Sequence, residues 1–582
     1  MSSNDSKQVD GGRADLIRWQ DAQQENFFLS DPNFLRLLNF YKGDKWLDQR
    51  KQEFSDFGER CATILNQAAE INNRNENLPR LERHDGVGQV KEEIDHHPSY
   101  VECGRVIYGS GMMKLQAEPG SFFHSLALFY LSNQNSEAGH NCPVACTAGV
   151  VRVLSRVVEP KLREKFLPQL VDPNFDTNHT GAQFLTEIQG GSDVGTNDCR
   201  VVAGDTPGSY RLSGEKWFCS SADADIFLIT ARFDAALPGT KGLGLFLVPR
   251  RLEDGTINGF SFRRLKDKLG TRSMASGEMD FEGAVAYAVG PVERGFKTVM
   301  ENVIHLSRIY NTLAVAGGAR RGYKTALSYA QHRRAFGKAI VEYPLVLETL
   351  ARLRVDSAAM LSGAMYCCDQ QDRVDTLSGA ETDDPNEALL YQRTLANLNK
   401  YRSAYTNTLG ACRAIEILGG NGAIESFSIL PRLLRDAIVS ENWEGTHNTL
   451  FMQTLKDISR YRVDEIFAKR MDGLISTLEG DSLGDARDLL SDRLTRLRGS
   501  VAAISKSGPE LASLQARELV ADMANLYYGV VLAAEAQWED HHAGSQDKLA
   551  LLELFCAFYL ADKAPTKDQT YLTLIRRVAL QG

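Results

Sequence analysis

DIFLITARFDAALPGTKGLGLFLVPR, residues 225–250, contains two short runs rich in β-branched and aromatic residues, separated by Asp, Pro and Gly. This composition is typical of β-strands joined by a turn. Four further runs of the same kind surround it: GAQFLTE (181–187), GSYRLSGEKWF (208–218), FSFRRL (260–265) and GEMDFEGAVAYAV (277–289). Together they predict a compact β domain from Thr180 to about Val289.

Apolar residues recur at helical spacing on both sides of this β region. Upstream examples are FLRLLNF (34–40) and FFHSLALFY (122–130), and downstream the pattern resumes near Val299 and continues to the end of the chain. We therefore predict an α+β fold in four parts: an N-terminal α-helical domain (1–179), a central β domain (180–289), a helical bundle (290–456) and a helical C-terminal extension (457–582).

Two segments lack either pattern. Residues 1–15 are polar and contain glycines, which predicts disorder. The section Glu70–Pro98 is charged and rich in turn-forming residues, which predicts a loop or a connection between helices.

The composition excludes several classes of protein. A chain of 582 residues is longer than one hydrophobic core usually supports, so several domains are expected. Its net charge of −9 disfavours a protein that works mainly by binding nucleic acid. The ten cysteines form no Cys-x-x-Cys pair and no zinc-like cluster, so we expect free thiols and no metal site. The N-terminus has no apolar signal core and no apolar run is long enough for a membrane span. We expect a soluble, cytoplasmic protein.

The first candidate site motif is FLTEIQGGSDVGTN, residues 184–197. A strand that leads into Thr186, followed by a Gly-Gly-Ser-Asp turn, allows the backbone to approach a flat ring or a phosphate with hydroxyls beside it. An ordinary glycine turn between strands is the alternative.

The second motif is GEKWFCSSADAD, residues 214–225. An indole at Trp217 with the small polar neighbours Cys219, Ser220 and Ser221 suits stacking on an aromatic cofactor. The alternative is a core tryptophan at the end of a strand.

The third motif is HRRAFGKAI, residues 332–340, where Arg333, Arg334 and Lys338 gather at the C-terminal end of a helical pattern. A cofactor pyrophosphate is one partner for these charges, and a solvated helix end is the other.

The fourth motif is EILGGNGAIESFSILPRLLRDAIVSENWEGTHNTLF, residues 416–451. Its glycines end one helix, and Trp443-Glu444-Gly445-Thr446 opens the next. Thr446 and Asn448 can cap that helix or bind phosphate. A glutamate at a helix start usually compensates the helix dipole, so Glu444 taken alone is only a weak catalytic candidate.

In this order and spacing, the four motifs resemble those of the acyl-CoA dehydrogenase family. The resemblance covers roughly Val101 to Phe451 and includes T-E-x-x-G-G-S-D, K-W-F, R-x-x-F-G, L-G-G-N-G, and R-D-A followed eight residues later by E-G-T. TEIQGGSDVGTN, GEKWFCS and NWEGTHN resemble the AidB-like branch. The helical extension after residue 456 resembles the extra C-terminal domains of AidB, very-long-chain dehydrogenases and acyl-CoA oxidases.

The resemblance implies FAD at the junction of the helical domain, the β domain and the bundle. On the isoalloxazine and pyrophosphate it places Leu185, Thr186, Gly191 and Ser192, and near flavin N5 it places Trp217, Phe218 and Cys219. Phosphate or ribose contacts fall to Thr446 and Asn448. Five further residues would contact the adenine half of FAD on a neighbouring subunit: Arg333, Phe336, Glu416, Gly419 and Gly420. This sharing implies a homo-oligomer, a dimer or a tetramer.

The resemblance also implies acyl-CoA as the substrate, bound by Ser192, Arg308 and Gly445, with Glu444 as the base. Ser307 stands at the base position that some relatives use, and a serine cannot act as that base. Three departures from the family pattern are Cys219 in place of a threonine, Glu416 in place of a glutamine, and Pro344 in place of a polar residue.

The predicted function is therefore an FAD-dependent dehydrogenase that introduces an α,β double bond into a medium- or long-chain fatty acyl-CoA, with electron-transferring flavoprotein as the implied electron acceptor. Two alternatives stay open: an AidB-like flavoprotein that binds acyl chains with little turnover, and an acyl-CoA oxidase. AidB-like relatives are associated with DNA through a basic C-terminal region. From Lys456 onward this chain has 16 Lys and Arg residues against 19 Asp and Glu residues, so no binding to nucleic acid is expected.

Overall fold

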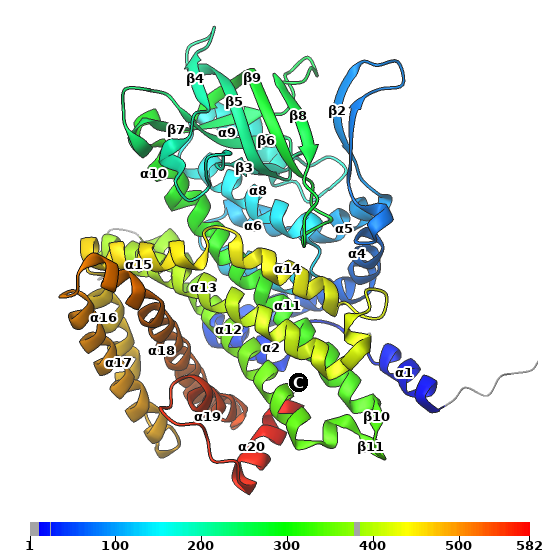
Figure 1. Cartoon of the computed structure of the whole chain (residues 1–582), viewed down its shortest axis with the longest axis vertical. Coiled ribbons are helices and arrows are strands. Elements are labelled where there is room, and N and C mark those ends of the chain that lie inside the picture. Colours follow the sequence, from blue (N-terminus) through cyan, green and yellow to red (C-terminus); the bar gives the residue numbers. More distant parts are fainter. Residues whose placement is uncertain (1–10, 24, 378–383, 582) are drawn as a thin grey trace, which may run out of the picture.

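The computed structural model describes residues 11–23, 25–377 and 384–581 (Figure 1). The chain forms a β domain that sits on a bundle of long helices, with the C-terminal helices along one side of that bundle (Figure 1). Helices precede and follow the single β domain, which confirms the predicted α+β fold.

The N-terminal part consists of short helices that share one hydrophobic core with the bundle. These are α1 (Gly11–Asp21), α2 (Pro32–Lys42), α3 (Asp44–Arg60), α4 (Asn66–Asn72), α5 (Pro98–Tyr108), α6 (Met112–Ala117), α7 (Phe122–Asn133), α8 (Ala138–Arg156) and α9 (Pro160–Leu170), with a π-helical turn η1 (Cys61–Leu65) between α3 and α4. Because α1 begins at Gly11, the prediction of disorder is wrong for residues 11–15. Residues 1–10 lie outside the described part of the chain.

The segment predicted to be a loop contains an antiparallel hairpin, β1 (Arg80–His84) and β2 (Val90–Asp95). Leu81 and Ile94 pack against the core of the β domain. The buried Glu92 carboxylate accepts hydrogen bonds from the Phe262 backbone N–H (2.8 Å) and Arg83 Nε (3.1 Å). The charged residues of this segment therefore form a hairpin, and apolar packing, the buried Glu92 carboxylate and an Arg251–Glu93 ion pair hold it to the β domain.

The β domain is a seven-stranded sheet in the order β3-β6-β4-β5-β9-β7, with β8 paired to β9. β7 pairs with both β9 and β6, so the sheet curls back on itself around a core of aromatic side chains. The strands are β3 (Gly181–Phe184), β4 (Arg200–Ala203), β5 (Ser209–Ser220), β6 (Ile226–Arg232), β7 (Leu243–Pro249), β8 (Phe260–Leu265) and β9 (Ser276–Ala288).

The bundle is built from α10 (Gly295–Val299), α11 (His305–His332), α12 (Pro344–Thr376), α13 (Pro385–Leu418), α14 (Leu430–Asn442) and α15 (His447–Tyr461). A π-helical turn, η6 (Met300–Ile304), joins α10 to α11 without a break, and π-helical turns are frequent at functional sites. Two short strands, β10 (Arg334–Ala335) and β11 (Lys338–Ala339), form a turn between α11 and α12.

The C-terminal helices pack on the bundle. They are α16 (Val463–Ser476), α17 (Gly484–Ile504), α18 (Pro509–Ala543), α19 (Asp547–Tyr559) and α20 (Gln569–Leu580), and they share its hydrophobic core. α15 runs without interruption across residue 456, where the extension was predicted to begin. A buried ion pair within the extension, Lys548 Nζ on α19 at 2.8 Å from Glu535 Oε2 on α18, is joined to the rest of the chain. Lys548 donates to Asn33 Oδ1 on α2 at 2.6 Å, and Glu535 accepts from Ser362 Oγ on α12 at 2.6 Å. Among the described residues, no helix combines the length and apolar character that a membrane crossing needs.

Candidate active site

A cleft of about 1440 Å³ lies where the β domain meets the bundle. Its walls come from β3, the end of β5, α8, α11 and the α14–α15 connection. Ten of the predicted site residues line it: Leu185, Thr186, Gly191, Ser192, Phe218, Arg308, Glu444, Gly445, Thr446 and Asn448. The fold thus brings together residues from three of the sequence motifs, two within residues 184–225 and one within residues 416–451.

Glu444 sits on the four-residue connection between α14 and α15, and its backbone adopts the left-handed conformation, with φ 56°. Gly445 follows with φ 105°. A non-glycine residue in this region costs about 1–3 kcal/mol unless its surroundings fix it. Arg308 Nε on α11 donates to the Glu444 backbone oxygen at 3.1 Å, and Gln183 Nε2 on β3 donates to the carboxylate at 3.2 Å. The carboxylate is therefore held in one orientation at the cleft wall.

Burial raises the pKa of Glu444 to about 7, against the opposing effects of the Arg308 and Lys400 charges and the Gln183 amide. A carboxylate normally titrates near 4.5. A general base is most effective when its pKa lies near the working pH, because it is then ionised and still a good proton acceptor. Glu444 has the properties of a base for a weakly acidic proton.

The two motifs of the β wall are tied together by a buried ion pair. Lys216 Nζ lies 2.6 Å from Glu187 Oε1, and both side chains are buried. Glu187 also accepts from the backbone N–H of Asp198. The backbone N–H of Trp217 donates to the backbone oxygen of Thr186 at 2.9 Å. The Gly-Gly-Ser-Asp turn is thus fixed beside the end of β5, and the two motifs form one wall of the cleft.

Side-chain alternation at the end of β5 corrects one sequence prediction. Phe218, with half its surface exposed, and Ser220 line the cleft. Cys219 points the other way into the core of the β domain, where it is fully buried and its thiol contacts the Lys216 carbonyl. Since successive side chains of a strand face opposite sides, Cys219 cannot present its thiol where Phe218 faces the cleft. The hydroxyl on the cleft side is that of Ser220.

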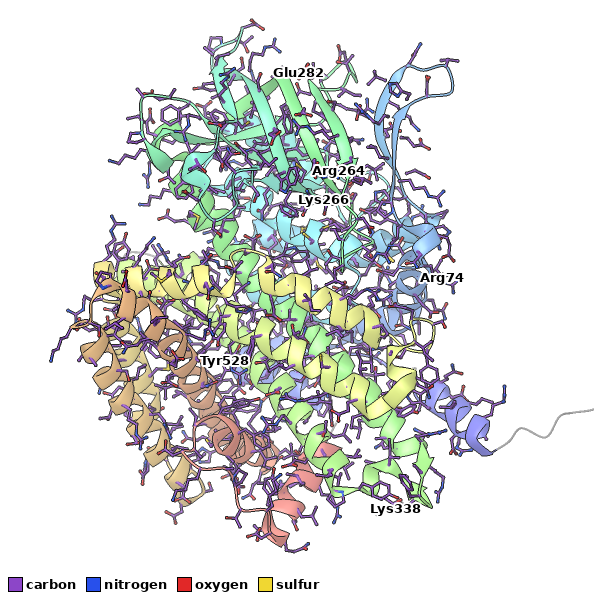
Figure 2. All side chains as sticks on the ribbon, viewed as in Figure 1. Arg74, Arg264, Lys266, Glu282, Lys338 and Tyr528 are labelled. Carbon is purple, nitrogen blue, oxygen red and sulfur yellow. The ribbon has the colours of Figure 1, made fainter. Side chains whose placement is uncertain are left out.

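Trp217 is not among the cleft-lining residues either. Its indole is covered by the Lys266 ammonium, 3.7 Å from the ring centroid, and Lys266 in turn lies 2.7 Å from Glu278 Oε1. Figure 2 shows Lys266 and Arg264 at the part of the β domain that faces the bundle. The predicted cofactor-stacking role therefore does not fit the indole, and Phe218 is the aromatic ring that faces the cleft.

Five predicted cofactor residues lie away from this cleft: Arg333, Phe336, Glu416, Gly419 and Gly420. Phe336 is 97% exposed, at the tip of the β10–β11 turn, and Glu416, Gly419 and Gly420 are exposed where α13 ends. Figure 2 shows Lys338, which belongs to the same turn as Phe336, at the far end of the bundle from the β domain. Within one chain these residues do not complete the cleft.

The structure adds residues that the sequence did not identify. Gln183 donates to both Ser307 Oγ (2.9 Å) and Glu444, and nothing in its spacing marks it out. Strand periodicity alone would have found Ser220 once Phe218 was assigned to the cleft.

The donor set suits a flat polar group that carries phosphates. Ser192 Oγ lies 3.3 Å from Thr449 Oγ1, and Thr446 and Asn448 stand at the N-terminus of α15, where the helix dipole favours an anion. Two buried oxygens of cleft residues, Gln183 Oε1 and Asn311 Oδ1, have no hydrogen-bond partner in the described part of the chain. Buried polar atoms are usually satisfied, so these two indicate a place for a ligand.

Comparison with known families agrees with this site. Residues 19–177 match the adaptive response protein AidB N-terminal domain, residues 182–284 the acyl-CoA dehydrogenase middle domain, and residues 293–458 the acyl-CoA dehydrogenase C-terminal domain. Acyl-CoA dehydrogenase family member 11 of Caenorhabditis elegans is 29% identical over 555 residues, which cover 89% of this chain and 87% of that protein. Putative acyl-CoA dehydrogenase AidB of Escherichia coli (strain K12) is 30% identical over 398 residues, covering 66% of this chain and 70% of that protein.

Two solved structures share the fold. ACDH-11 of Caenorhabditis elegans in complex with C11-CoA has a TM-score of 0.86 at 26% identity, covering 97% of this chain and 94% of that chain. An acyl-CoA dehydrogenase of Bacillus anthracis complexed with FAD has a TM-score of 0.67 at 17% identity, covering 83% and 86%. The domain matches, the relatives and the cleft agree, and the chain belongs to the AidB-like branch of the acyl-CoA dehydrogenase family, a family of oxidoreductases.

Proposed function

We propose that this protein is an FAD-dependent acyl-CoA dehydrogenase that introduces an α,β double bond into a medium- or long-chain fatty acyl-CoA, with Glu444 as the base. The observation that carries the proposal is the Glu444 carboxylate itself. It is held at the cleft wall by Gln183, and burial raises its pKa to about 7. The α-proton of a thioester is only weakly acidic, so the protein must supply a base that is both ionised at neutral pH and fixed in orientation.

Different residues of the cleft would bind the flavin ring, the phosphates and the acyl-CoA. The isoalloxazine ring of FAD would lie against Leu185, Thr186, Phe218 and Ser220, with phosphate held by Ser192, Thr446 and Asn448. When bound, FAD supplies the acceptor for the β-hydride. Arg308 and Gly445 border the position of the acyl-CoA, and Glu444 removes the α-proton.

The exposed set fits the adenosine half of FAD in a neighbouring subunit. Phe336, Glu416, Gly419 and Gly420 are exposed, Arg333 is partly exposed, and none of the five lines the cleft of Glu444. We infer a homo-oligomer, a dimer or a tetramer, in which each cofactor contacts two chains. A cytoplasmic location completes the proposal.

A solved relative supports the proposed substrate, and the family resemblance supports the proposed electron acceptor. ACDH-11 was solved with C11-CoA, which supports a medium- or long-chain acyl group for this chain as well. The cleft, at about 1440 Å³, exceeds the usual range for a single small ligand and has room for a cofactor and an acyl chain together. Electron-transferring flavoprotein is the proposed acceptor.

An anaerobic titration with acyl-CoAs of increasing chain length tests the proposal. The flavin of the wild-type protein should bleach with medium- or long-chain acyl-CoA and should recolour when electron-transferring flavoprotein is added. Binding of acyl-CoA without bleaching would instead support the AidB-like protein with little turnover. Fast recolouring by oxygen with release of peroxide would support the oxidase.

A further inference from the structure

Lys400, in the middle of α13, belongs to none of the sequence motifs, yet it contacts the Glu444 connection at both ends. Its Nζ donates to the Glu441 backbone oxygen and to the Gly445 backbone oxygen, each at 2.7 Å. Its side chain has no exposed surface. A single ammonium group therefore joins the last turn of α14 to the residue after Glu444.

These contacts fall where the backbone is strained. The connection between the two carbonyls contains the left-handed Glu444 and Gly445, and Arg308 holds the carbonyl of Glu444 from α11. Lys400 donates from α13 and Arg308 from α11, so two buried cations hold main-chain oxygens on either side of the Glu444 peptide and at Glu444 itself. A compact ammonium with three donors suits two converging carbonyls better than a planar guanidinium does.

The charge of Lys400 is not cancelled by a direct partner. Its hydrogen bonds in the described part of the chain go to main-chain oxygens, whereas the buried Lys548 lies 2.8 Å from the Glu535 carboxylate. Burial lowers the pKa of Lys400 to about 7, because removing an ammonium from water is costly. A buried cation without a carboxylate in contact is a cost to folding, and at this place it acts on Glu444.

We propose that Lys400 is a positioning residue for the base: its contacts with the Glu441 and Gly445 backbone oxygens hold Glu444 in its left-handed conformation, and its ammonium group, while protonated, stabilises the ionised Glu444 carboxylate. This inference rests on the proposed function only in giving Glu444 the role of base. The contacts themselves belong to the fold.

The groups that face Glu444 limit the alternatives. They are Arg308 on α11, Lys400 on α13, Gln183 on β3, and Cys146 on α8, while Glu441 on α14 faces Lys400. Arg308 and Lys400 are the two charges that lower the pKa of Glu444, and burial is the opposing influence. Removing Lys400 should therefore make the carboxylate harder to ionise.

Three substitutions separate charge from hydrogen bonding. Lys400→Met removes both, Lys400→Gln keeps an amide donor but removes the charge, and Lys400→Arg keeps the charge. Lys548→Met is the matched control, since Lys548 is equally buried but lies in the C-terminal extension. All four variants are compared with wild type as FAD-loaded, full-length proteins.

Two measurements are made on each variant. The first is the pH profile of anaerobic flavin reduction by acyl-CoA, and the second is an isotope-edited infrared titration of the Glu444 carboxyl, identified by its loss in Glu444→Gln. We expect Lys400→Met and Lys400→Gln to move both titrations upward by about one pH unit, with an about five-fold slower reduction at pH 7, where the wild-type carboxyl is half ionised. Lys400→Arg should leave the titrations near their wild-type position.

The proposal is overturned if Lys400→Met or, should that variant not fold, Lys400→Gln loses thermal stability as Lys548→Met does while the Glu444 titration stays in place. The infrared titration of the Glu444 carboxyl does not depend on turnover. If wild-type protein binds acyl-CoA without flavin reduction, the proposed function fails, while a shifted Glu444 titration in the Lys400 variants still supports the positioning role.

Discussion

The predicted cofactor residues fall into two sets that lie in different parts of the molecule. The cleft set is held by the chain's own contacts, such as Gln183 to Glu444, Trp217 N–H to Thr186, and Lys216 to Glu187. The outer set contains Phe336, which is almost fully exposed in a left-handed turn, and Arg333 beside it. The Phe336 ring has one edge-on neighbour, Tyr343, at 6.4 Å between centroids, and the rest of its surface is open to solvent. Within one chain the cleft residues thus contact one another around Glu444, whereas the outer set lies away from the cleft; the proposed role of the outer set therefore depends on a second subunit.

The largest expected effect is at the base of the cleft set. Glu444→Gln keeps the shape and the contact with Gln183 but cannot accept a proton. We expect anaerobic flavin reduction to slow by about a thousand-fold or more, about 4 kcal/mol of barrier, with FAD content and acyl-CoA binding nearly unchanged. Stopped-flow absorbance measures the rate. Flavin reduction at the wild-type rate would mean that another group is the base, and the cleft set would then no longer be distinguished by containing the base.

The pH dependence of the same reaction should follow the raised pKa of Glu444. Only the ionised carboxylate accepts a proton, so the rate should fall about ten-fold per pH unit below about 7 and level off above it. This fall in rate at acidic pH should be absent from the residual activity of Glu444→Gln. A fall in rate near the ordinary carboxylate value of 4.5 would mean that ligands in the cleft cancel the effect of burial.

The outer set should affect cofactor retention without affecting the chemistry. Arg333→Ala should weaken FAD binding by about ten-fold, the loss expected for one charge-assisted phosphate contact, and loosen the oligomer. Arg334→Ala, at the adjacent exposed position, is the matched control and should change neither. Fluorescence titration of FAD and mass measurement with and without the cofactor report the two effects. Equal behaviour of the two variants would place Arg333 outside the cofactor site.

The order of helical, β and helical regions could be predicted from the sequence because its signal is local. Short β-branched and aromatic runs mark the β domain, and helical periodicity marks the rest. The hairpin at 80–95 was missed because its strands are charged and mostly exposed, and its single buried carboxylate, Glu92, looks like any surface glutamate. Its hydrogen bond to Phe262 spans 170 residues, a distance that no local pattern reports.

The site was predictable only where a motif surrounds the residue. Glu444, Thr186 and Ser192 lie within the four quoted stretches, and the structure places all three at the cleft. Lys400 and Gln183 act on Glu444 from α13 and β3 across the fold, and neither has a spacing that distinguishes it. Cys219 differs from both cases, because it lies inside a motif that borders the cleft, yet strand alternation turns its side chain into the β-domain core.

The smallest expected effect concerns that parity at the end of β5. Ser220 lines the cleft and Cys219 lies in the β-domain core, so paired alanine variants should separate cofactor contact from packing. Ser220→Ala should shift the flavin absorbance bands and change the reduction rate by a few-fold, since one neutral hydrogen bond contributes about 0.5–1.5 kcal/mol. Cys219→Ala should leave the spectrum and rate unchanged and lower the melting temperature slightly, because a buried sulfur is replaced by a small void. The reverse pattern, a spectral change with Cys219→Ala and none with Ser220→Ala, would mean that the strand slips by one residue when the cofactor binds. A one-residue slip turns every side chain of the strand to the other face, and it would also break the Trp217 N–H contact with Thr186.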